Sequence, residues 1–477
     1  MKNLENLRPV GRLERYSTAR HDLKFYLGPA VTASYKLSKS YALPLKDYIY
    51  RVLGDVIAQH PILSAIPVDE HTQNPYFVRL SEIDLDQCVT FQVRQQDYPW
   101  EAETRDAELD ELLGSQHSIP YEAPIPFWRL RVLYQSTHFT AAFFYHHALG
   151  DGQSGIAFHR TFHKALSSAS TGSLAIPVPK IIATPSTPLL PNLEALHPLP
   201  VTIWYLLKVL FREWVLSKFW PARDPGLWTG GTCTAPLGQT RVRSLNIPAL
   251  TTTALKNVCR ENGTTITAAL QTLIAGVLFA HLPDNFRGLA CSGALSARRF
   301  LQKDARITDD VMGVFVQDMS ESYNRHSFDA AQDSKRDISL LSWSEAQRSR
   351  RNIENILSLK GANAEANLLK YVNNFHEELF LSKIGKHRDK SFEVSNLGLV
   401  KPGTSAHGES DVEMGRMVFT QSAGVTAAAI QVSVVTGADG CLVLGITWQE
   451  GIVEDGLVHD ALEGVAAEIE RLTSKSQ

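Results

Sequence analysis

The chain has 477 residues, more than one compact core usually holds, so two domains or two lobes around a shared cleft are expected. With 44% apolar and 20% charged residues it resembles an ordinary soluble protein, and the absence of an uncharged apolar run of about 18 residues argues against a membrane-spanning helix. A formal net charge of -3 and dispersed basic residues argue against nucleic acid as a partner.

The N-terminus has no apolar segment of signal-peptide length, so a cytoplasmic location is expected. Five cysteines are an odd number, they are scattered, and none forms a Cys-x-x-Cys pair. This pattern argues against a disulfide framework and a zinc site, and it predicts buried free thiols. The cysteines are Cys88, Cys233, Cys259, Cys291 and Cys441.

The first part of the chain mixes helical and extended patterns. Apolar residues at helical spacing predict helices over 17–26, 45–56, 102–113 and 158–169. Extended or alternating apolar patterns predict strands at 31–37, 76–83, 88–94, 127–134 and 139–145. The last of these strands is almost entirely apolar or small, which is typical of a strand buried on both faces.

Residues 167–200 are rich in Ser, Thr and Pro, which indicates an extended linker with the lobe boundary within it or just after it. Residues 201–220 follow, rich in Trp, Leu, Phe and Tyr but carrying four charges. A helix packed across the lobes is the favoured interpretation of this stretch. A helix lying on a membrane surface is the alternative, and it would give a weak membrane association.

The second part of the chain again mixes both kinds of element. Strands are predicted at 241–247, 288–295, 312–319, 392–398, 428–436 and 441–448. Helices are predicted at 249–261, after a Thr264 or Thr265 cap, within a polar region at 328–381, and at 455–472. Gly437-Ala438-Asp439-Gly440 predicts a hairpin between the last two strands. The pattern favours an α+β fold, with an N-terminal lobe at 1–190, a linker at 191–235 and a C-terminal lobe at 236–477.

The strand at 139–145 leads into His146-His147-Ala148-Leu149-Gly150-Asp151-Gly152. Residues 150–155 satisfy G-x-G-x-x-G, but the helix after them runs into the linker and not into a second parallel strand, which argues against a dinucleotide site. A metal site built from His147, Asp151, His159 and His163 is also disfavoured. The last two histidines lie about two turns along the helix, where surface or groove positions are expected.

General acid–base catalysis is the third interpretation. A histidine can take a proton from a hydroxyl group and return it to a leaving group, provided that a neighbour holds its ring or its loop. Asp151 could do this directly or through an arginine, and the flanking glycines allow a tight turn. The plain alternative makes both histidines ordinary strand-end residues and Asp151 a helix cap, and the motif alone does not decide between them. No G-x-S-x-G elbow or Walker loop supplies a rival nucleophile or phosphate site.

These residues resemble the His-His-x-x-x-Asp-Gly signature of acyltransferases related to chloramphenicol acetyltransferase and the peptide-synthetase condensation domains. The chain is most similar to the fungal alcohol acetyltransferase branch. That similarity rests on three further segments in the expected order: Gly11-Arg12-Leu13-Glu14-Arg15-Tyr16-Ser17, Ser395-Asn396-Leu397-Gly398 and Gly445-Ile446-Thr447-Trp448-Gln449-Glu450-Gly451. The resemblance therefore spans nearly the whole chain.

The resemblance implies two lobes, each with a mixed sheet and flanking helices, and an active-site tunnel between them. His147 would be the general base, and His146 would have no direct role. Asp151, tied to an arginine, and Gly152 would shape the loop. A segment near 392–410, with 392–399 as the candidate strand, would return to the first lobe. The Asp-Phe-Gly-Trp-Gly motif of the plant branch is missing, so Ser395 and Asn396 are the candidates for the oxyanion or substrate contacts.

The expected activity is acyl-coenzyme A-dependent O-acyltransfer, with acetyl-coenzyme A as a co-substrate, no permanently bound cofactor or metal, and a hydrophobic alcohol or secondary metabolite as the acceptor. A monomer is expected. Two alternatives stay open, since a fold does not fix a reaction. The fold could serve cyclisation or dehydration of a bound metabolite, or the protein could be a non-catalytic binding module.

Overall fold

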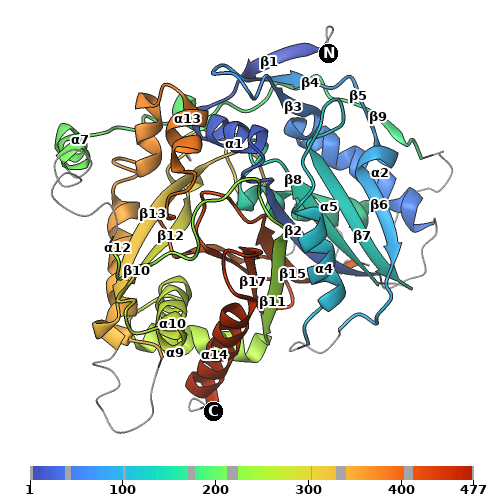
Figure 1. Cartoon of the computed structure of the whole chain (residues 1–477). Helices are drawn as coiled ribbons and strands as arrows, with labels where there is room; N and C mark the ends of the chain where they lie inside the picture. Colours follow the sequence, from blue (N-terminus) through green and yellow to red (C-terminus); the bar gives the residue numbers. More distant parts are fainter. Residues whose placement is uncertain are drawn as a thin grey trace.

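The computed structural model describes residues 4–37, 44–99, 104–136, 138–169, 178–211, 224–301, 303–328, 340–401 and 412–474. Two large sheets dominate it, one built mainly from the first part of the chain and one from the second (Figure 1). Each sheet has helices against it, which confirms the expected α+β class with mixed sheets.

The first sheet has five strands in the order β15-β2-β8-β7-β6. Their bounds are Val412–Gln421, Pro29–Leu37, His138–Tyr145, Trp128–Gln135 and Val89–Val93. All neighbours are antiparallel except β6 and β7, which are parallel. Every residue of β8 is buried, as its apolar sequence predicts. The sheet therefore holds the strand before the histidine motif at its centre.

Helices α2 (Leu45–Gln59) and α5 (Gly152–Ala169) pack on one face of this sheet, where Phe143 and Phe158 stack in the core. On the other face, α4 (Ala107–Gln116) and Val443 of the second sheet pack against alternate residues of β8. Helix α1 (Arg12–Asp22) precedes β2. Two faces of β8 are thus covered, one by helices and one at the contact between the sheets.

Small sheets border this part of the molecule. Strands β1 (Glu5–Pro9), β4 (Tyr76–Arg79) and β3 (Ala65–Val68) form one of them. Strands β5 (Glu82–Asp84) and β9 (Ile181–Ala183) form the other, so part of the expected linker is an edge strand. Short helices lie between these elements: η1 (Pro61–Ser64), α3 (Leu85–Cys88) and α6 (Leu193–Leu196).

The second sheet has the order β10-β12-β14-β16-β17-β11, with β13 paired to β12. In that order the strands are Leu227–Trp228, Gly288–Ser296, Phe392–Leu399, Ile430–Thr436, Leu442–Gln449 and Thr240–Ile247, and β13 is Val316–Asn324. Helices α9 (Ala249–Glu261), α10 (Ile266–His281) and α14 (Asp455–Ser474) share its core. Thr265 caps α10, and β16 and β17 form the predicted hairpin.

The polar region after β13 is less regular than predicted. It contains α12 (Trp343–Ser358), η4 (Glu365–Tyr371), α13 (Phe375–Leu379) and η5 (Leu381–Lys383). All five cysteines are buried free thiols, as predicted. In the part of the chain that the structure describes, no single helix has the length and apolar character to cross a membrane; α9 and α10 pass such a test only together, across a 93° bend.

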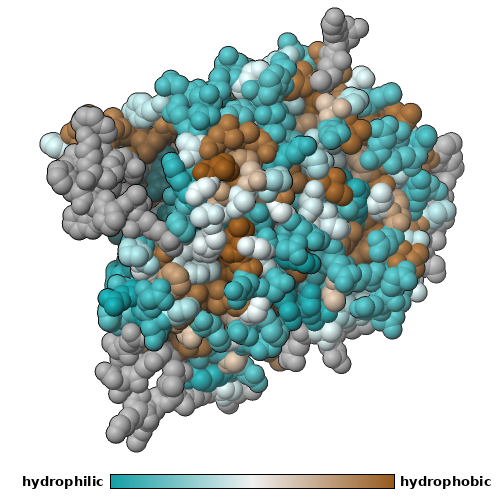
Figure 2. Space-filling view, in the orientation of Figure 1, coloured by the Kyte–Doolittle hydropathy of each residue, from teal (hydrophilic) through white to brown (hydrophobic). Residues whose placement is uncertain are grey.

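Helix α7 (Ile203–Leu210) has no buried residue, so packing across the lobes is wrong for this stretch. Its exposed side chains include Ile203, Trp204 and Leu207. Residues 212–220 of the expected helix lie outside the described residues, and the membrane interpretation stays a prediction. The face shown in Figure 2 is mainly hydrophilic with separate apolar patches.

Three predicted elements need correction. The strand that crosses to the first sheet is β15, Val412–Gln421, whereas residues 392–399 pair with β12 and β16 inside the second sheet. Helix α1 begins after Gly11, where Glu14 satisfies the backbone, and not at a Ser or Thr cap near residue 17. Strand β13 begins at Val316 because the residues before it turn around the Asp151 carboxylate. The exact lobe boundaries at 190 and 235 stay predictions.

Candidate active site

The His-His-x-x-x-Asp-Gly motif lies between the end of β8 and the start of α5. The backbone N–H of His146 still donates to Phe127 O, at 2.9 Å, and that of Leu149 donates to His146 O, at 2.9 Å. Asp151 then accepts from Ser154 N and Ser154 Oγ, both at 3.0 Å. The first turn of α5 is therefore fixed by the carboxylate that the plain interpretation assigned to a helix cap.

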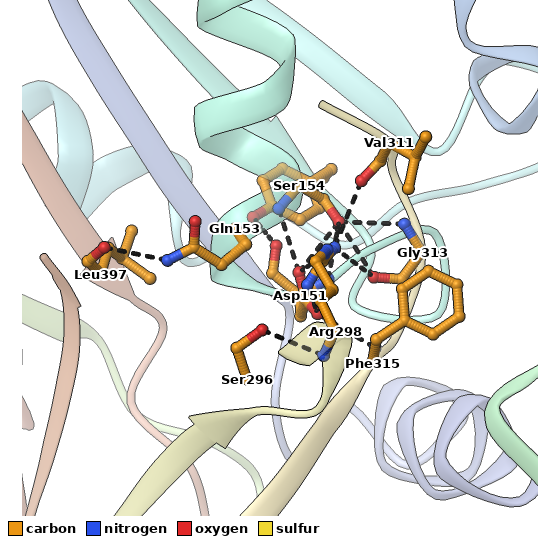
Figure 3. Close-up of polar contacts among 10 residues, drawn as sticks. Asp151, Gln153, Ser154, Ser296, Arg298, Val311, Gly313, Phe315 and Leu397 are labelled. Carbon is orange, nitrogen blue, oxygen red and sulfur yellow. Dashed lines mark hydrogen bonds and ion pairs between the residues drawn. The ribbon is translucent and has the colours of Figure 1, made fainter. Parts of the chain in front are cut away.

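Gly152 allows a close approach between distant segments. A Cβ at this position would lie 2.5 Å from Leu397 Cδ2 and 3.3 Å from Phe419 Cζ. Gln153 Nε2 donates to Leu397 O at 2.9 Å (Figure 3). The motif thus contacts β14 and β15, and the absence of a side chain at Gly152 leaves room for both.

Asp151 forms a buried bidentate ion pair with Arg298 (Figure 3). Arg298 Nη1 lies 2.7 Å from Oδ2 and Nη2 lies 3.0 Å from Oδ1, while Phe315 N donates to Oδ2 at 3.0 Å. Burial raises the pKa of Asp151, but Arg298 and the N–H groups of Phe315 and Ser154 outweigh it, so the pKa is lowered overall. The pair ties the motif to the turn before β13.

This geometry matches one of the two roles considered for Asp151, that of fixing the loop through an arginine. Among the described residues, no hydrogen bond joins its carboxylate to His147; both oxygens serve Arg298 and the backbone. Asp151 therefore holds the loop and takes no part in orienting the His147 ring directly. Sequence reasoning anticipated an arginine but did not identify Arg298, although it lies in a polar run between two predicted strands.

His147 is half-buried, and its Nδ1 atom is buried without a hydrogen-bond partner among the described residues. For Nε2 the described residues provide no hydrogen-bond partner. Burial and the positive charge of Arg20 lower the pKa of His147 to about 3. The imidazole is therefore neutral near neutral pH and can accept a proton at Nε2, the property that a general base requires.

Polar residues from three segments gather beside His147. The Tyr26 ring lies 5.9 Å from the His147 ring, and the Arg20 guanidinium stacks 3.8 Å from the Tyr26 centroid. Tyr26 Oη donates to Gln421 Oε1 at 3.1 Å, and Gln421 Nε2 donates to Glu393 Oε1 at 3.0 Å. Burial raises the pKa of Glu393. No local pattern in the sequence signals this group, because its members come from α1, the loop after it, β14 and β15.

His146 is buried, 1% exposed, and makes its own polar contacts. Its Nδ1 accepts from Ala148 N at 3.0 Å, and its Nε2 lies 3.1 Å from Glu70 Oε1. His21 Nδ1 lies 2.8 Å from the other carboxylate oxygen, Glu70 Oε2. Neither Glu70 nor His21 belongs to a motif in the sequence.

The other two motif-proximal histidines are not at the surface, so that expectation is wrong. His159 is fully buried and contacts Tyr35 Oη and Val31 O, both at 2.8 Å. His163 is also buried, with Nε2 2.9 Å from Val412 O. These contacts belong to the packing of α5 on the first sheet.

Ser395 and Asn396 lie on β14 directly before Leu397, the residue of this strand that contacts Gly152. Ser395 is buried opposite Ser433 on β16. Asn396 Nδ2 donates to Thr267 Oγ1 at 3.0 Å, and its Oδ1 accepts from Gly398 N at 2.8 Å. Asn396 also lines a cavity of about 420 Å³. Their roles as oxyanion or substrate contacts stay predictions.

The chain is similar to known proteins over nearly its whole length. Residues 9–462 match the model of the family described as alcohol acetyltransferase. A probable alcohol acetyltransferase of Aspergillus fumigatus, crmB, is 36% identical over 97% of this chain and 99% of its own length. Another, FCK4 of Fusarium pseudograminearum, is 24% identical over 97% and 94%.

Solved structures share the fold at low sequence identity. The trichothecene 15-O-acetyltransferase TRI3 of Fusarium sporotrichioides superposes with a TM-score of 0.68 at 13% identity, covering 98% of this chain and 95% of its own. The first condensation domain of the calcium-dependent antibiotic synthetase gives a TM-score of 0.63 at 12% identity, covering 99% and 97%. The expected two-lobed acyltransferase fold is confirmed, and the chain is an acyltransferase that belongs to the alcohol acetyltransferase family.

Proposed function

We propose that this protein is an acyl-coenzyme A-dependent O-acyltransferase that acetylates a hydroxyl group of a hydrophobic alcohol, with His147 as the general base. The observation that carries the proposal is the position of His147, whose ring makes no hydrogen bond to another described residue, in a loop fixed by the buried Asp151–Arg298 pair. Such a base can accept a proton from the substrate.

In the proposed reaction, His147 Nε2 takes the hydroxyl proton as the alcohol oxygen attacks the thioester carbonyl carbon. The C–S bond then breaks, and the imidazolium returns the proton to the departing thiolate. The negative charge on the carbonyl oxygen needs a donor in the intermediate. Ser395 is the better of the two candidates, because the amide of Asn396 is already bonded to Thr267 and Gly398.

The cavity beside Asn396 fits the donor side of this proposal. Two cationic side chains of α9, Lys256 and Arg260, line it together with Thr265 at the start of α10. Phosphate groups favour guanidinium and ammonium partners and the N-terminus of a helix. We therefore place the nucleotide end of acyl-coenzyme A at Lys256 and Arg260, with its thioester directed past Asn396 toward His147.

The first experiment compares His147→Ala with His459→Ala, which changes a half-exposed histidine of α14. Acetyl transfer to a panel of hydrophobic alcohols is followed by mass spectrometry. Loss of a general base should lower kcat by about 10²–10⁴-fold, while calorimetry should find acetyl-coenzyme A binding unchanged. Near wild-type turnover by His147→Ala would refute the mechanism. Conversion of an acceptor without any acyl donor would instead favour reuse of the fold for cyclisation or dehydration.

The second experiment tests the donor site. Lys256→Ala and Arg260→Ala should raise KM for acetyl-coenzyme A without changing KM for acetyl-pantetheine, which lacks the nucleotide. Lys164→Ala, at an exposed position on α5, is the matched control. Equal effects on both donors would argue against phosphate recognition at α9.

A further inference from the structure

A buried polar cluster lies directly behind the catalytic loop, on the far side of His146 from Nδ1. It consists of His21 at the end of α1, Glu70 in the turn between β3 and β4, and His146. The His21 and His146 rings meet edge to face at 4.4 Å. Each carboxylate oxygen of Glu70 faces one imidazole, at 2.8 Å and 3.1 Å.

The backbone determines which nitrogen of each ring carries the proton. Ala148 N–H donates to His146 Nδ1 at 3.0 Å, so this nitrogen is unprotonated and the proton is on Nε2, facing Glu70. Tyr121 N–H donates to His21 Nε2 at 3.2 Å, so His21 carries its proton on Nδ1, which also faces Glu70. His21 thus donates its N–H to Glu70 Oε2, while the N–H of His146 lies 3.1 Å from Glu70 Oε1 in a contact that is too poorly aligned to count as a hydrogen bond.

The same two backbone contacts disfavour a metal ion, although the three ligand atoms lie within 4.8 Å of one another. A metal would need the lone pairs of His146 Nε2 and His21 Nδ1. Each neutral ring would then carry its proton on the nitrogen that faces a backbone N–H, and two donors would oppose each other. The tautomers that the backbone favours therefore place ring N–H groups, and not lone pairs, opposite Glu70.

The pKa values of Glu70 and His146 agree with this arrangement of N–H groups around the carboxylate. Burial would raise the pKa of Glu70, but its contacts with His146 and His21 lower it to about 2. Burial and the neighbouring His21 lower the pKa of His146 to about 4. Near neutral pH the cluster holds one carboxylate and a neutral His146, which matches the donor pattern above.

His146 in turn fixes the peptide groups on both sides of His147. Its backbone C=O, in the peptide before His147, accepts from Leu149 N at 2.9 Å, and its side chain accepts at 3.0 Å from the N–H of Ala148, in the peptide after His147. A rotation of the His146 ring would break the hydrogen bond from Ala148 N and free the peptide group that follows His147. The orientation of His146 therefore determines the direction of His147.

We propose that Glu70 is a positioning residue of the acyl-transfer reaction, whose carboxylate faces the N–H groups of His146 and His21, holds the two rings in place and so fixes the backbone that carries His147. This rests on the proposed function in one respect only, that His147 is the base. The arrangement of protons in the cluster stands independently of it.

The decisive variant is Glu70→Gln, which has nearly the same shape. An amide oxygen can accept from one imidazole, but the amide NH₂ then faces the N–H of the other, and the backbone prevents either ring from exchanging its proton position. A displacement of about 1 Å in a catalytic group can cost about 10²-fold in rate, so kcat should fall by about this factor with KM for acetyl-coenzyme A unchanged. Glu82→Gln, at an exposed position on β5, is the control.

A second substitution should restore activity. In Glu70→Gln/His21→Asn the asparagine amide can turn its oxygen toward the glutamine NH₂, and the glutamine oxygen can still accept from His146. The double variant should therefore recover most of the lost kcat, whereas His21→Asn alone should be close to wild type. Two single effects that simply multiply would overturn the proposal, since independent sites show no coupling.

Nitrogen NMR of histidine-labelled protein tests the cluster without any activity assay, with signals assigned through the His21 and His146 variants. The expected result near neutral pH is a proton on Nε2 of His146 and on Nδ1 of His21. The opposite tautomers, or imidazolium at both rings, would overturn the proposal. So would a stoichiometric metal, detected by mass spectrometry, whose removal by a chelator abolishes activity. If His147→Ala stayed active while these tautomers were observed, only the proposed function would fail.

Discussion

Replacing Arg298 with methionine would leave the Asp151 carboxylate buried without its cation. The two side chains are 3% and 0% exposed, so water cannot replace the guanidinium. Removing one partner of a buried ion pair typically costs about 3–5 kcal/mol. Asp151 keeps its bonds from Ser154 and Phe315, so we expect about 3 kcal/mol, the lower end of that range. For domains of about 150–250 residues this corresponds to a fall in Tm of roughly 6–12 °C.

Differential scanning fluorimetry of Arg298→Met against Arg299→Met measures this effect, since Arg299 is the exposed neighbour on the same turn. The pH dependence gives a second check. The pKa of Asp151 is lowered in the native protein, so the pair stabilises the fold above the unfolded pKa, and this is lost as the pH falls through the native value. In Arg298→Met, burial raises that pKa, so the stability deficit should shrink on acidification. Equal melting temperatures for the two variants, or a deficit that grows in acid, would refute the reasoning.

Two further predictions concern the base and the packing behind it. The charge of Arg20 lowers the pKa of His147, so Arg20→Met should raise that pKa and move the acidic limb of the kcat/KM profile to higher pH; an unmoved limb contradicts the assignment. A Cβ at Gly155 would overlap Val31 Cγ2, so Gly155→Ala should cost about 1–3 kcal/mol. Gly456→Ala, in α14 with no atom within 4 Å of the added Cβ, should be neutral or slightly stabilising, and equal denaturation midpoints for the two alanine variants would count against this reading.

Local patterns were sufficient for the elements whose boundaries depend on neighbouring residues. Thr265 caps α10 through its own side chain, and the hairpin at 437–440 follows from its glycines. The strand at 139–145, almost entirely apolar or small, can be predicted because burial on both faces removes the need for alternation. The residues that determine these features lie within a few positions of the features themselves.

Long-range pairing could not be predicted in the same way. Segments 392–399 and 412–421 are both extended, and nothing in either one says which sheet it joins. The site shows the same limit. His147 could be identified from its motif, whereas Arg298 and Glu70 act through partners far away in sequence, and the role of Glu70 depends on backbone N–H groups that have no sequence signature.

The crossing of β15 has a consequence for the order in which the chain can fold. Strand β2 lies between β8 and β15, so one of its edges stays unpaired until residues 412–421 have been synthesised. An open strand edge is a site for pairing with other chains, and contacts between such distant segments form slowly. The sheet that presents the catalytic loop therefore becomes complete only near the end of translation, and a chain that stops before β15 would carry every residue of the motif without the strand that closes the sheet beside it.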